Sequence, residues 1–276
     1  MTKINLLLGF LAILFLASCQ KDTNPVLIYD IHDEFNIEIY QELSEANEVF
    51  LKLTTLEKYP SNYRIEADAY INSGNIELNI YRIYKPQTPA PNNVFLTKKV
   101  KLGALNLGTH PLDLIIRNNI SNEGLISVNP NTIELDFSTK NGISSKHYEV
   151  NRFHPNDYWG IASVDSSYHA IYVDQFINKI TAESTPINQP NIGNYGYFSI
   201  SPQGDIELSY TPRGYYRTFF MSAEDFTQIN AYIQEYKNLG ISFHATVITA
   251  KGQVYQHVEN EQSPFVQQTL ELCTIP

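Results

Sequence analysis

The sequence predicts two β-rich domains: a β-sandwich over residues 26–153 and an α+β domain with a mostly antiparallel sheet over residues 154–276. In the first region, apolar and polar positions alternate and no convincing helix separates the predicted strands. In the second region, apolar positions also recur at three and four, which is the helical period. The chain is 43% hydrophobic and 12% aromatic, so it has ample material for packed cores.

The alternation is clearest around the predicted turn at residues 72–75. Residues 63–71 place their apolar side chains on one face of a strand, and residues 76–80 resume the pattern after the turn. Two alternating runs joined by Asn, Ser and Gly predict a β-hairpin. Beyond the second run the apolar phase slips to Tyr81 and Ile83, which indicates a bulge.

Further strands are predicted where short apolar runs lie between connections that contain Pro, Asn or Gly. They cover residues 27–31, 35–40, 48–54, 94–102, 112–117, 132–137 and 148–153. Many short strands at this spacing are typical of an antiparallel sandwich.

One segment within this region, residues 100–114, carries a Leu-x-x-Gly-x-x-x-Leu-x-Leu pattern. The pattern positions are Leu105, Gly108, His110, Leu112 and Leu114. The segment resembles the strand-turn-strand of bacterial immunoglobulin-like domains, in which an aromatic residue usually stands where this chain has a histidine. The resemblance implies an immunoglobulin-like sandwich and implies no activity.

The second region opens with a predicted helix. Asp165–Ser167 is a candidate helix cap, and a strand through Ala170–Val173 is the alternative reading of the residues that follow. The helical stripe consists of Val173, Phe176, Ile177 and Ile180.

A loop over residues 185–194 is predicted to follow this helix. It leads to a hairpin whose strands, 195–200 and 205–210, flank a turn at residues 201–204. Residues 215–221 then form the next strand.

The end of the chain is predicted to contain two more helices and two more strands. Ser222 caps a helix that ends at Gly240, strands cover residues 241–247 and 254–258, and a last helix opens at Ser263-Pro264. Strands that meet through hairpins, with helices between the groups, predict a mostly antiparallel sheet with helices on one face.

The first nineteen residues resemble the signal peptide of a bacterial lipoprotein. Lys3 precedes an apolar run, residues 4–16, in which Asn5 is the only polar side chain and which is too short to cross a hydrocarbon core of roughly 30 Å as a helix. The run ends in Leu16-Ala17-Ser18-Cys19, which is similar to a lipobox. The resemblance implies removal of residues 1–18 and attachment of diacylglycerol to the thiol of Cys19, and therefore an envelope protein anchored by its lipid.

Residues 19–25 are predicted to be a tether, because they are polar, turn-forming and have nothing to bury. The segment is also similar to the short acidic export signals of surface lipoproteins of Bacteroidota, although Asp22 is its only acidic residue. A plain flexible linker is the alternative. The anchor is therefore expected in the outer membrane, on its surface or its periplasmic face.

Net charge limits the classes of partner. Removing residues 1–18 takes away one basic residue, Lys3, and no acidic residue, which changes the formal charge from −10 to −11. An acidic surface repels phosphate, so nucleic acid is excluded as a partner and contact with a membrane is expected only through the lipid. With Cys19 acylated, Cys273 has no intrachain disulfide partner.

No catalytic motif stands out. Residues 19–276 contain no Gly-x-Ser-x-Gly or Ser-x-x-Lys motif. Cys273 could pair with His257 or His244 as a thiolate nucleophile, but it lies on the apolar stripe of the last predicted helix, and buried structural cysteines are inert. Metal-ligand spacings are also missing, and the nearest candidate set is Asp30, His32 and Glu34 on one face of an extended segment. No metal and no cofactor are predicted.

An aromatic and cationic concentration between residues 195 and 220 is the leading candidate for ligand binding. Its members are Tyr195, Tyr197, Tyr210, Arg213, Tyr215, Tyr216 and Arg217. Tyrosine and arginine are enriched at recognition hot spots. The alternative is that these tyrosines pack against their own domain.

A smaller candidate cluster lies at the predicted domain junction and consists of His154, Tyr158 and Trp159. Ligand sites favour domain interfaces, although a lone tryptophan there is also typical of a packing residue. The sequence therefore favours a non-catalytic binding module for a glycan or an envelope protein. The alternatives are a lipid-anchored hydrolase of a cell-wall or extracellular polymer and a structural subunit of an envelope complex.

Overall fold

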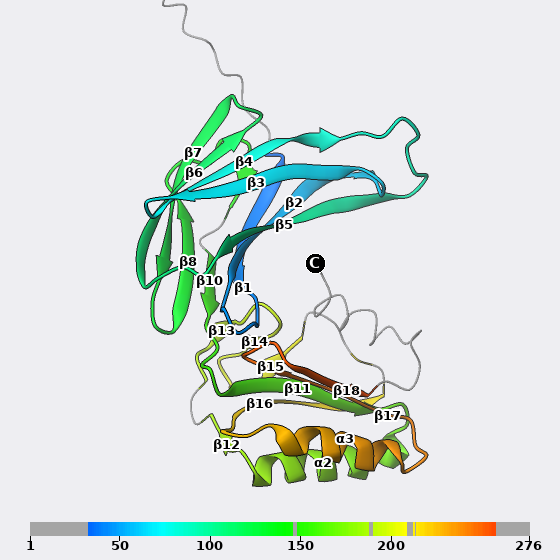
Figure 1. Ribbon diagram of the computed structural model, residues 1–276. Coiled ribbons are helices and arrows are strands. Elements are labelled where there is room, and N and C mark those ends of the chain that lie inside the picture. The colour runs from blue at the N-terminus through cyan, green and yellow to red at the C-terminus, as the bar shows by residue number, and fades with distance from the viewer. Residues whose placement is uncertain (1–32, 146–147, 188–189, 209–211, 213, 258–276) are drawn as a thin grey trace, which may run out of the picture. The chain divides into compact units, whose positions relative to one another are not determined.

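The computed structural model describes residues 33–145, 148–187, 190–208, 212 and 214–257 (Figure 1). These residues belong to one compact unit, His32–Pro276, and most of them lie in β-strands. The described strands form several sheets that are mostly antiparallel, which is consistent with the predicted β-sandwich. The division into domains at residue 153 stays a prediction.

The first sheet has the strand order β5-β2-β1-β9. Its strands are β1 (Phe35–Gln41), β2 (Val49–Pro60), β5 (Asn93–Gly103) and β9 (Ile143–Ser144). The pairs β1–β2 and β2–β5 are antiparallel, and β1 pairs with β9 in parallel. The strand predicted at residues 27–31 lies outside the described residues.

The second sheet has the order β10-β8-β7-β6-β4-β3, with β4 and β6 parallel. Its strands are β3 (Arg64–Asn72), β4 (Asn75–Tyr84), β6 (Gly108–Ile116), β7 (Ile120–Val128), β8 (Thr132–Phe137) and β10 (Tyr148–Asn151). The predicted hairpin is β3–β4. Its predicted bulge is also confirmed, because Glu66 pairs with Arg82 and Ala67 pairs with Ile80, which leaves Tyr81 without a partner in β3.

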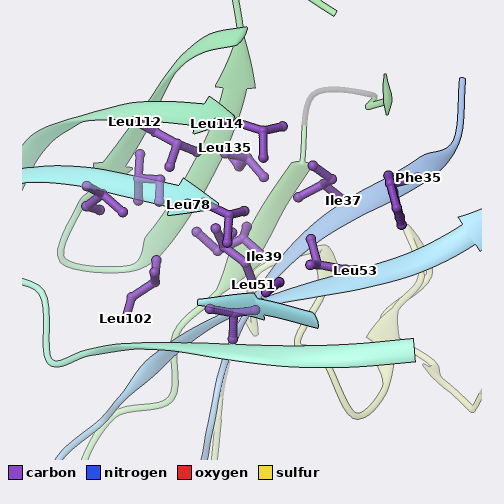
Figure 2. Packing of buried hydrophobic residues seen from close by; sticks show 14 of the residues in the cluster. Phe35, Ile37, Ile39, Leu51, Leu53, Leu78, Leu102, Leu112, Leu114 and Leu135 are labelled. Atoms are coloured by element: carbon purple, nitrogen blue, oxygen red, sulfur yellow. The ribbon is translucent and has the colours of Figure 1, made fainter. Parts of the chain in front are cut away.

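Side chains from both sheets form one hydrophobic cluster (Figure 2). Ile37 and Ile39 of β1, Leu51 of β2 and Leu114 of β6 are at most 2% exposed. Along β1 buried and half-buried positions alternate without a break, so this strand presents only one face to the core. The alternation that predicted the sandwich strands therefore results from burial of one face of each strand.

The third sheet is fully antiparallel and has the order β12-β16-β11-β17-β18. Its strands are β11 (Asp157–Val164), β12 (Thr185–Pro186), β16 (Tyr215–Ser222), β17 (Phe243–Thr249) and β18 (Val254–His257). Helices α2 (Ala170–Ala182) and α3 (Thr227–Lys237) cover one face of it (Figure 1). A short 3-10 helix, η1 (Ser167–His169), precedes α2.

Both predicted helices within the described residues are present. Val173, Phe176, Ile177 and Ile180 of α2 are buried as the stripe predicts, and the alternative strand at Ala170–Val173 is wrong.

The predicted cap of α3 is wrong. Ser222 is the last residue of β16, where it pairs with Asp157, and α3 begins only at Thr227. The carboxylate of Asp225 accepts hydrogen bonds from the amide and the hydroxyl of Thr227, at 2.8 and 2.9 Å. At its other end α3 ends at Lys237, before the predicted Gly240, which has a φ of +68° in the turn that follows.

A small fourth sheet contains β13 (Gly193–Asn194), β14 (Ser199–Ile200) and β15 (Ile206–Glu207). Its strands are shorter than the predicted hairpin, because a turn from Tyr195 to Phe198 interrupts the first arm. A third hydrophobic cluster joins this sheet to one face of the third sheet through Tyr195, Phe198, Trp159 and Ile248, and it includes Leu43 and Phe153.

Candidate functional site

A cavity of about 680 Å³ lies along strand β16. Its floor is the β16 segment Tyr216–Met221. One wall comes from α2, through Ile177, Asn178 and Thr181, and the opposite wall comes from the hairpin of β14 and β15, through residues 204–206. Its volume is in the range of small-molecule and peptide sites. We call this cavity the β16 groove.

The groove exists because β16 is paired along only part of one edge. Strand β11 pairs with every residue from Tyr215 to Ser222, whereas on the other side β12 pairs only with Met221 and Ser222. Strand β12 ends at Pro186, and a proline has no backbone N–H to donate to a ladder. Among the described residues, the β16 segment from Tyr215 to Phe220 therefore has a strand partner on one side only.

The side chains of β16 alternate between two environments. Phe219 and Met221 belong to the hydrophobic cluster beneath α2 and α3, and Phe220 packs with the third cluster on the opposite face. This follows from the pleat, since successive side chains of a strand point to opposite faces. The groove floor is thus fixed by buried anchors on both faces of the sheet.

Asp174 of α2 fixes the polar side chains at one end of the floor. Its Oδ1 accepts hydrogen bonds from the hydroxyl of Tyr215 and from Nη1 of Arg217, both at 3.0 Å. The side chain of Arg217 is still 51% exposed. The guanidinium is therefore oriented and its charge is balanced, while part of it faces solvent.

The opposite wall carries a charge that is not balanced in the same way. Asp205 is exposed in the turn between β14 and β15, and its carboxylate makes no ion pair with another described residue. With Arg217 neutralised by Asp174, the β16 groove has a net acidic character.

The sequence-predicted binding residues separate into two groups. Tyr216 and Arg217 line the groove, and Tyr215 supports it through Asp174. Tyr195 is 4% exposed and stacks on Phe198 with ring centroids 5.0 Å apart.

Burial raises the pKa of Tyr195 to about 12. Tyr197 is half-buried and its hydroxyl accepts a hydrogen bond from the backbone amide of Leu43 at 3.2 Å. Tyr195 is therefore a packing residue, whereas Tyr197 lines a separate cavity of about 220 Å³ together with Phe198 and Leu208. Tyr210 and Arg213 lie outside the described residues.

The predicted junction residues do not meet at a site. Tyr158 and Trp159 are neighbours in β11, so they point to opposite faces of the sheet and are 0% and 1% exposed. Burial raises the pKa of Tyr158 to about 12, and its hydroxyl contacts the hydroxyl of Ser184. His154 is exposed. Tyr158 and Trp159 are packing residues of two different clusters.

The structure also brings together three residues that the sequence did not indicate as a group: Asp165, Ser242 and His244. The Ser242 hydroxyl donates to Oδ2 of Asp165 at 2.7 Å and lies 3.2 Å from Nε2 of His244, and the same nitrogen lies 3.5 Å from Oδ1 of Asp165. In a Ser-His-Asp triad the carboxylate binds the other ring nitrogen and the serine proton points at the imidazole. Here the contacts of Ser242 and of Asp165 are both to Nε2, which differs from the triad geometry, and they tie the start of β17 to the end of β11.

The other candidates for chemistry fall largely outside the described part of the chain. Asp30, His32 and Cys273 are among the undescribed residues, and Glu34 forms an ion pair with Arg117. In the described ranges no three His, Cys, Asp or Glu side chains converge as metal ligands would. Within the same ranges, neither helix has the length and apolar character to cross a bilayer.

Comparison with models of protein families, with curated proteins and with solved structures finds no match for this chain. Functional inference therefore depends on the residues and their geometry.

Proposed function

We propose that this chain is a lipid-anchored protein of the bacterial cell envelope that acts as a non-catalytic binding module, with the β16 groove as its ligand site. Acylated Cys19 would hold it to the outer membrane, and residues 19–25 would act as the tether. The lipobox-like sequence and the apolar run before it support this anchoring.

We further propose that residues 26–153 form an immunoglobulin-like sandwich and that residues 154–276 form an α+β domain. Two sheets packed around one cluster support the first assignment, and Leu112 and Leu114 of the immunoglobulin-like segment are buried in that cluster. The third sheet with helices on one face supports the second. In this proposal the sandwich is a spacer that carries the groove away from the membrane.

One observation carries the binding function: Tyr216 and Arg217, both partly exposed, line a cavity of about 680 Å³ on a rigid strand. A rigid ring and an oriented guanidinium give contact at low entropic cost, since Asp174 already restricts the arginine. A site built on a sheet is also positioned more accurately than one built on loops.

The groove assignment is tested with a double variant, Tyr216→Ser with Arg217→Gln, in the full-length acylated protein. The matched control is Tyr168→Ser with Lys237→Gln, which removes the same ring and charge at positions that are exposed and outside the groove. Binding of purified envelope polysaccharide and of solubilised envelope proteins is measured against both. We expect the groove variant to lose at least about tenfold in affinity, since one or two hot-spot contacts are worth that much.

Two results would contradict the proposal. Equal binding by the groove variant and the control would show that the ligand site lies elsewhere. Hydrolysis of a polymer that disappears in Ser242→Ala or His244→Gln would instead support the hydrolase alternative.

For the anchor, Cys19→Ser is expected to move the protein from the membrane fraction to the soluble fraction, and no change would refute acylation at that residue.

A further inference from the structure

We propose that the partner held in the β16 groove is an extended polypeptide segment with a basic side chain, which adds to the open edge of β16 as a further strand. This inference rests on the proposed binding function and names the class of its ligand. Three features of the groove carry it: the backbone of the floor, the residues on the two walls and the charge of the rim.

The floor offers a regular row of backbone groups. From Tyr215 to Phe220, β16 pairs with β11 on one side and has no strand partner on the other among the described residues. An open strand edge presents alternating N–H and C=O groups, which a second extended chain can satisfy in register. Short strand β12 pairs with the last two residues of β16, Met221 and Ser222, and Ile187 and Pro190, which follow it, line the same cavity. An added segment would extend this ladder from Phe220 toward Tyr215.

The walls match the alternation of a strand. Side chains of an added segment would point alternately to the two faces of the sheet. On one face they would meet Ile177, Asn178 and Thr181 of α2, and on the other they would meet Ile200 and Ile206 beside Asp205. Backbone pairing with pockets for alternate side chains is the pattern of strand addition.

The same features argue against a glycan as the ligand. Sugar rings usually stack on exposed aromatic faces. Tyr195, a member of the predicted binding set, is buried together with Phe198 in the third hydrophobic cluster. Tyr216 remains as a partly exposed ring on the floor, at 38% exposure. The hydroxyl groups of a glycan also do not follow the alternating row of N–H and C=O groups that pairs with a strand edge.

Charge selects the sequence of the segment. Arg217 is neutralised by Asp174, whereas the exposed carboxylate of Asp205 makes no ion pair with another described residue. A lysine or arginine that points toward the hairpin of β14 and β15 would supply the missing charge. The acidic character of the mature chain also favours a basic partner, since it attracts such segments over distance.

The walls also decide against a second copy of this chain. Residues of α2 and of the β14–β15 turn line the same cavity as β16, so the open edge lies between two walls. A single extended segment is narrow enough to enter, whereas the edge of another folded sheet brings its own covering elements. Dimerisation through β16 is therefore an outcome that the experiment must test.

The probe is a set of acetylated and amidated hexapeptides based on Val-Thr-Val-Lys-Val-Thr, with Ile, Leu or Phe in place of Val. Binding to the full-length acylated protein is measured by fluorescence anisotropy. Each peptide is compared with a twin that carries N-methyl groups at alternate residues, which removes the backbone donors on one edge. We expect the unmethylated peptides to bind and methylation of the pairing edge to lower affinity at least about tenfold, because several hydrogen bonds are lost together.

A charge exchange tests the rim. Asp205→Lys is expected to weaken the lysine peptide about tenfold and to improve a glutamate peptide of otherwise equal sequence. Glu45→Lys, an exposed position outside the groove, is the control and should change neither affinity. Melting curves of both variants check that the fold is retained. We expect it to be retained because both substituted positions are exposed.

Each other result overturns the inference in a recognisable way. If no hexapeptide binds but envelope polysaccharide binds and the Tyr216→Ser, Arg217→Gln variant loses it, the groove is a binding site and the polypeptide class is wrong. If methylated and unmethylated peptides bind equally, strand addition is wrong. If a concentration-dependent dimer disappears in Asp205→Lys while no peptide binds, the edge pairs copies of this chain. If nothing binds at the groove, the proposed function fails together with the inference.

Discussion

Strands β1 and β11 bury their side chains in different ways. Along β1 every second residue is buried and the residues between are half-buried, whereas all eight residues of β11 are buried. Strand β1 contributes one face to a single cluster, in which Ile37 and Ile39 are at most 2% exposed. Strand β11 lies between β16 and β17, with the helix-covered cluster on one face and the third cluster at Trp159 on the other.

Burial on both faces makes β11 a fixed element of the third sheet. A strand covered on both faces has no position at which a side chain can be changed freely, so it holds its neighbours in a fixed register. Strand β16 takes its place from β11, to which it is paired from end to end. The groove floor is therefore anchored to a strand whose residues are all buried.

The largest expected effect comes from Gly160, at the middle of β11. A Cβ at this residue would lie 2.4 Å from Cζ of Phe219 and 2.6 Å from the backbone oxygen of Thr246. Neither the buried ring nor the paired backbone has room to move away. Gly160→Val is expected to prevent folding, as measured by far-ultraviolet circular dichroism and by soluble yield.

The control for this prediction introduces the same side chain on β1. Asn36 is half-buried on the outer row of that strand, and valine favours extended backbone. Asn36→Val is expected to fold and to change the free energy of unfolding by less than about 1 kcal/mol. A folded Gly160→Val protein with normal stability would contradict the two-sided packing of β11.

The next effect compares consecutive residues in the two strands. Tyr158→Ala and Trp159→Ala are each expected to lower the free energy of unfolding by about 3–5 kcal/mol, since each empties a different cluster. On β1 only one of two neighbouring substitutions should strongly lower the free energy of unfolding. Ile37→Ala is expected to lose about 2–5 kcal/mol, and Glu38→Ala, a half-buried polar residue, less than about 1 kcal/mol.

Urea titrations of the four single variants measure this pattern. The alternation of large and small effects should appear in β1 and be missing in β11. A small loss for either Tyr158→Ala or Trp159→Ala would show that one face of β11 is not packed, and the comparison between the strands would then be wrong.

The same contrast explains what the sequence could predict. One-sided burial leaves period-two alternation, so β3, β4 and even the bulge at Tyr81 were predictable from the sequence. Two-sided burial does not require a period of two: the run Asp157–Val164 has none and is not predicted as a strand, whereas β17, which is also fully buried, keeps an alternating sequence and is predicted. The first residues of β11 were interpreted as a junction cluster instead, because Tyr158 and Trp159 are neighbours in sequence although they face opposite sides.

The candidate site was predictable only in part for a related reason. Composition indicated Tyr216 and Arg217, but their surroundings come from strand pairing and helix placement. Asp174 lies 43 residues before Arg217, and Asp165 lies 77 residues before its hydrogen-bond donor Ser242. No local pattern connects such pairs. Pro186 is a sequence feature that favours the end of β12 after two residues, but no local pattern shows that the edge of β16 from Tyr215 to Phe220 is left without a second strand partner among the described residues.

The smallest of the three effects is a pH dependence at Asp157, the first residue of β11. This carboxyl group is 4% exposed and accepts a hydrogen bond from the backbone amide of His154 at 2.8 Å. Burial raises its pKa above the ordinary aspartate value, and the hydrogen bond from His154 opposes that shift only in part. The equivalent first position of β1 is Phe35, which has no titratable group.

The sign follows from proton linkage. Because the pKa is higher in the folded protein than in the unfolded chain, the folded state binds more protons in the interval between the two values. The contribution of Asp157 to stability is therefore complete below the unfolded pKa and is lost as the pH rises through the folded value. Asp157→Asn has no proton to lose and lacks this dependence. The difference in free energy of unfolding, wild type minus Asp157→Asn, should fall as the pH is raised across that interval in urea titrations. A difference that is constant or rises with pH would show that burial does not raise the pKa of the Asp157 carboxyl group. The first residue of β11 would then be open to solvent.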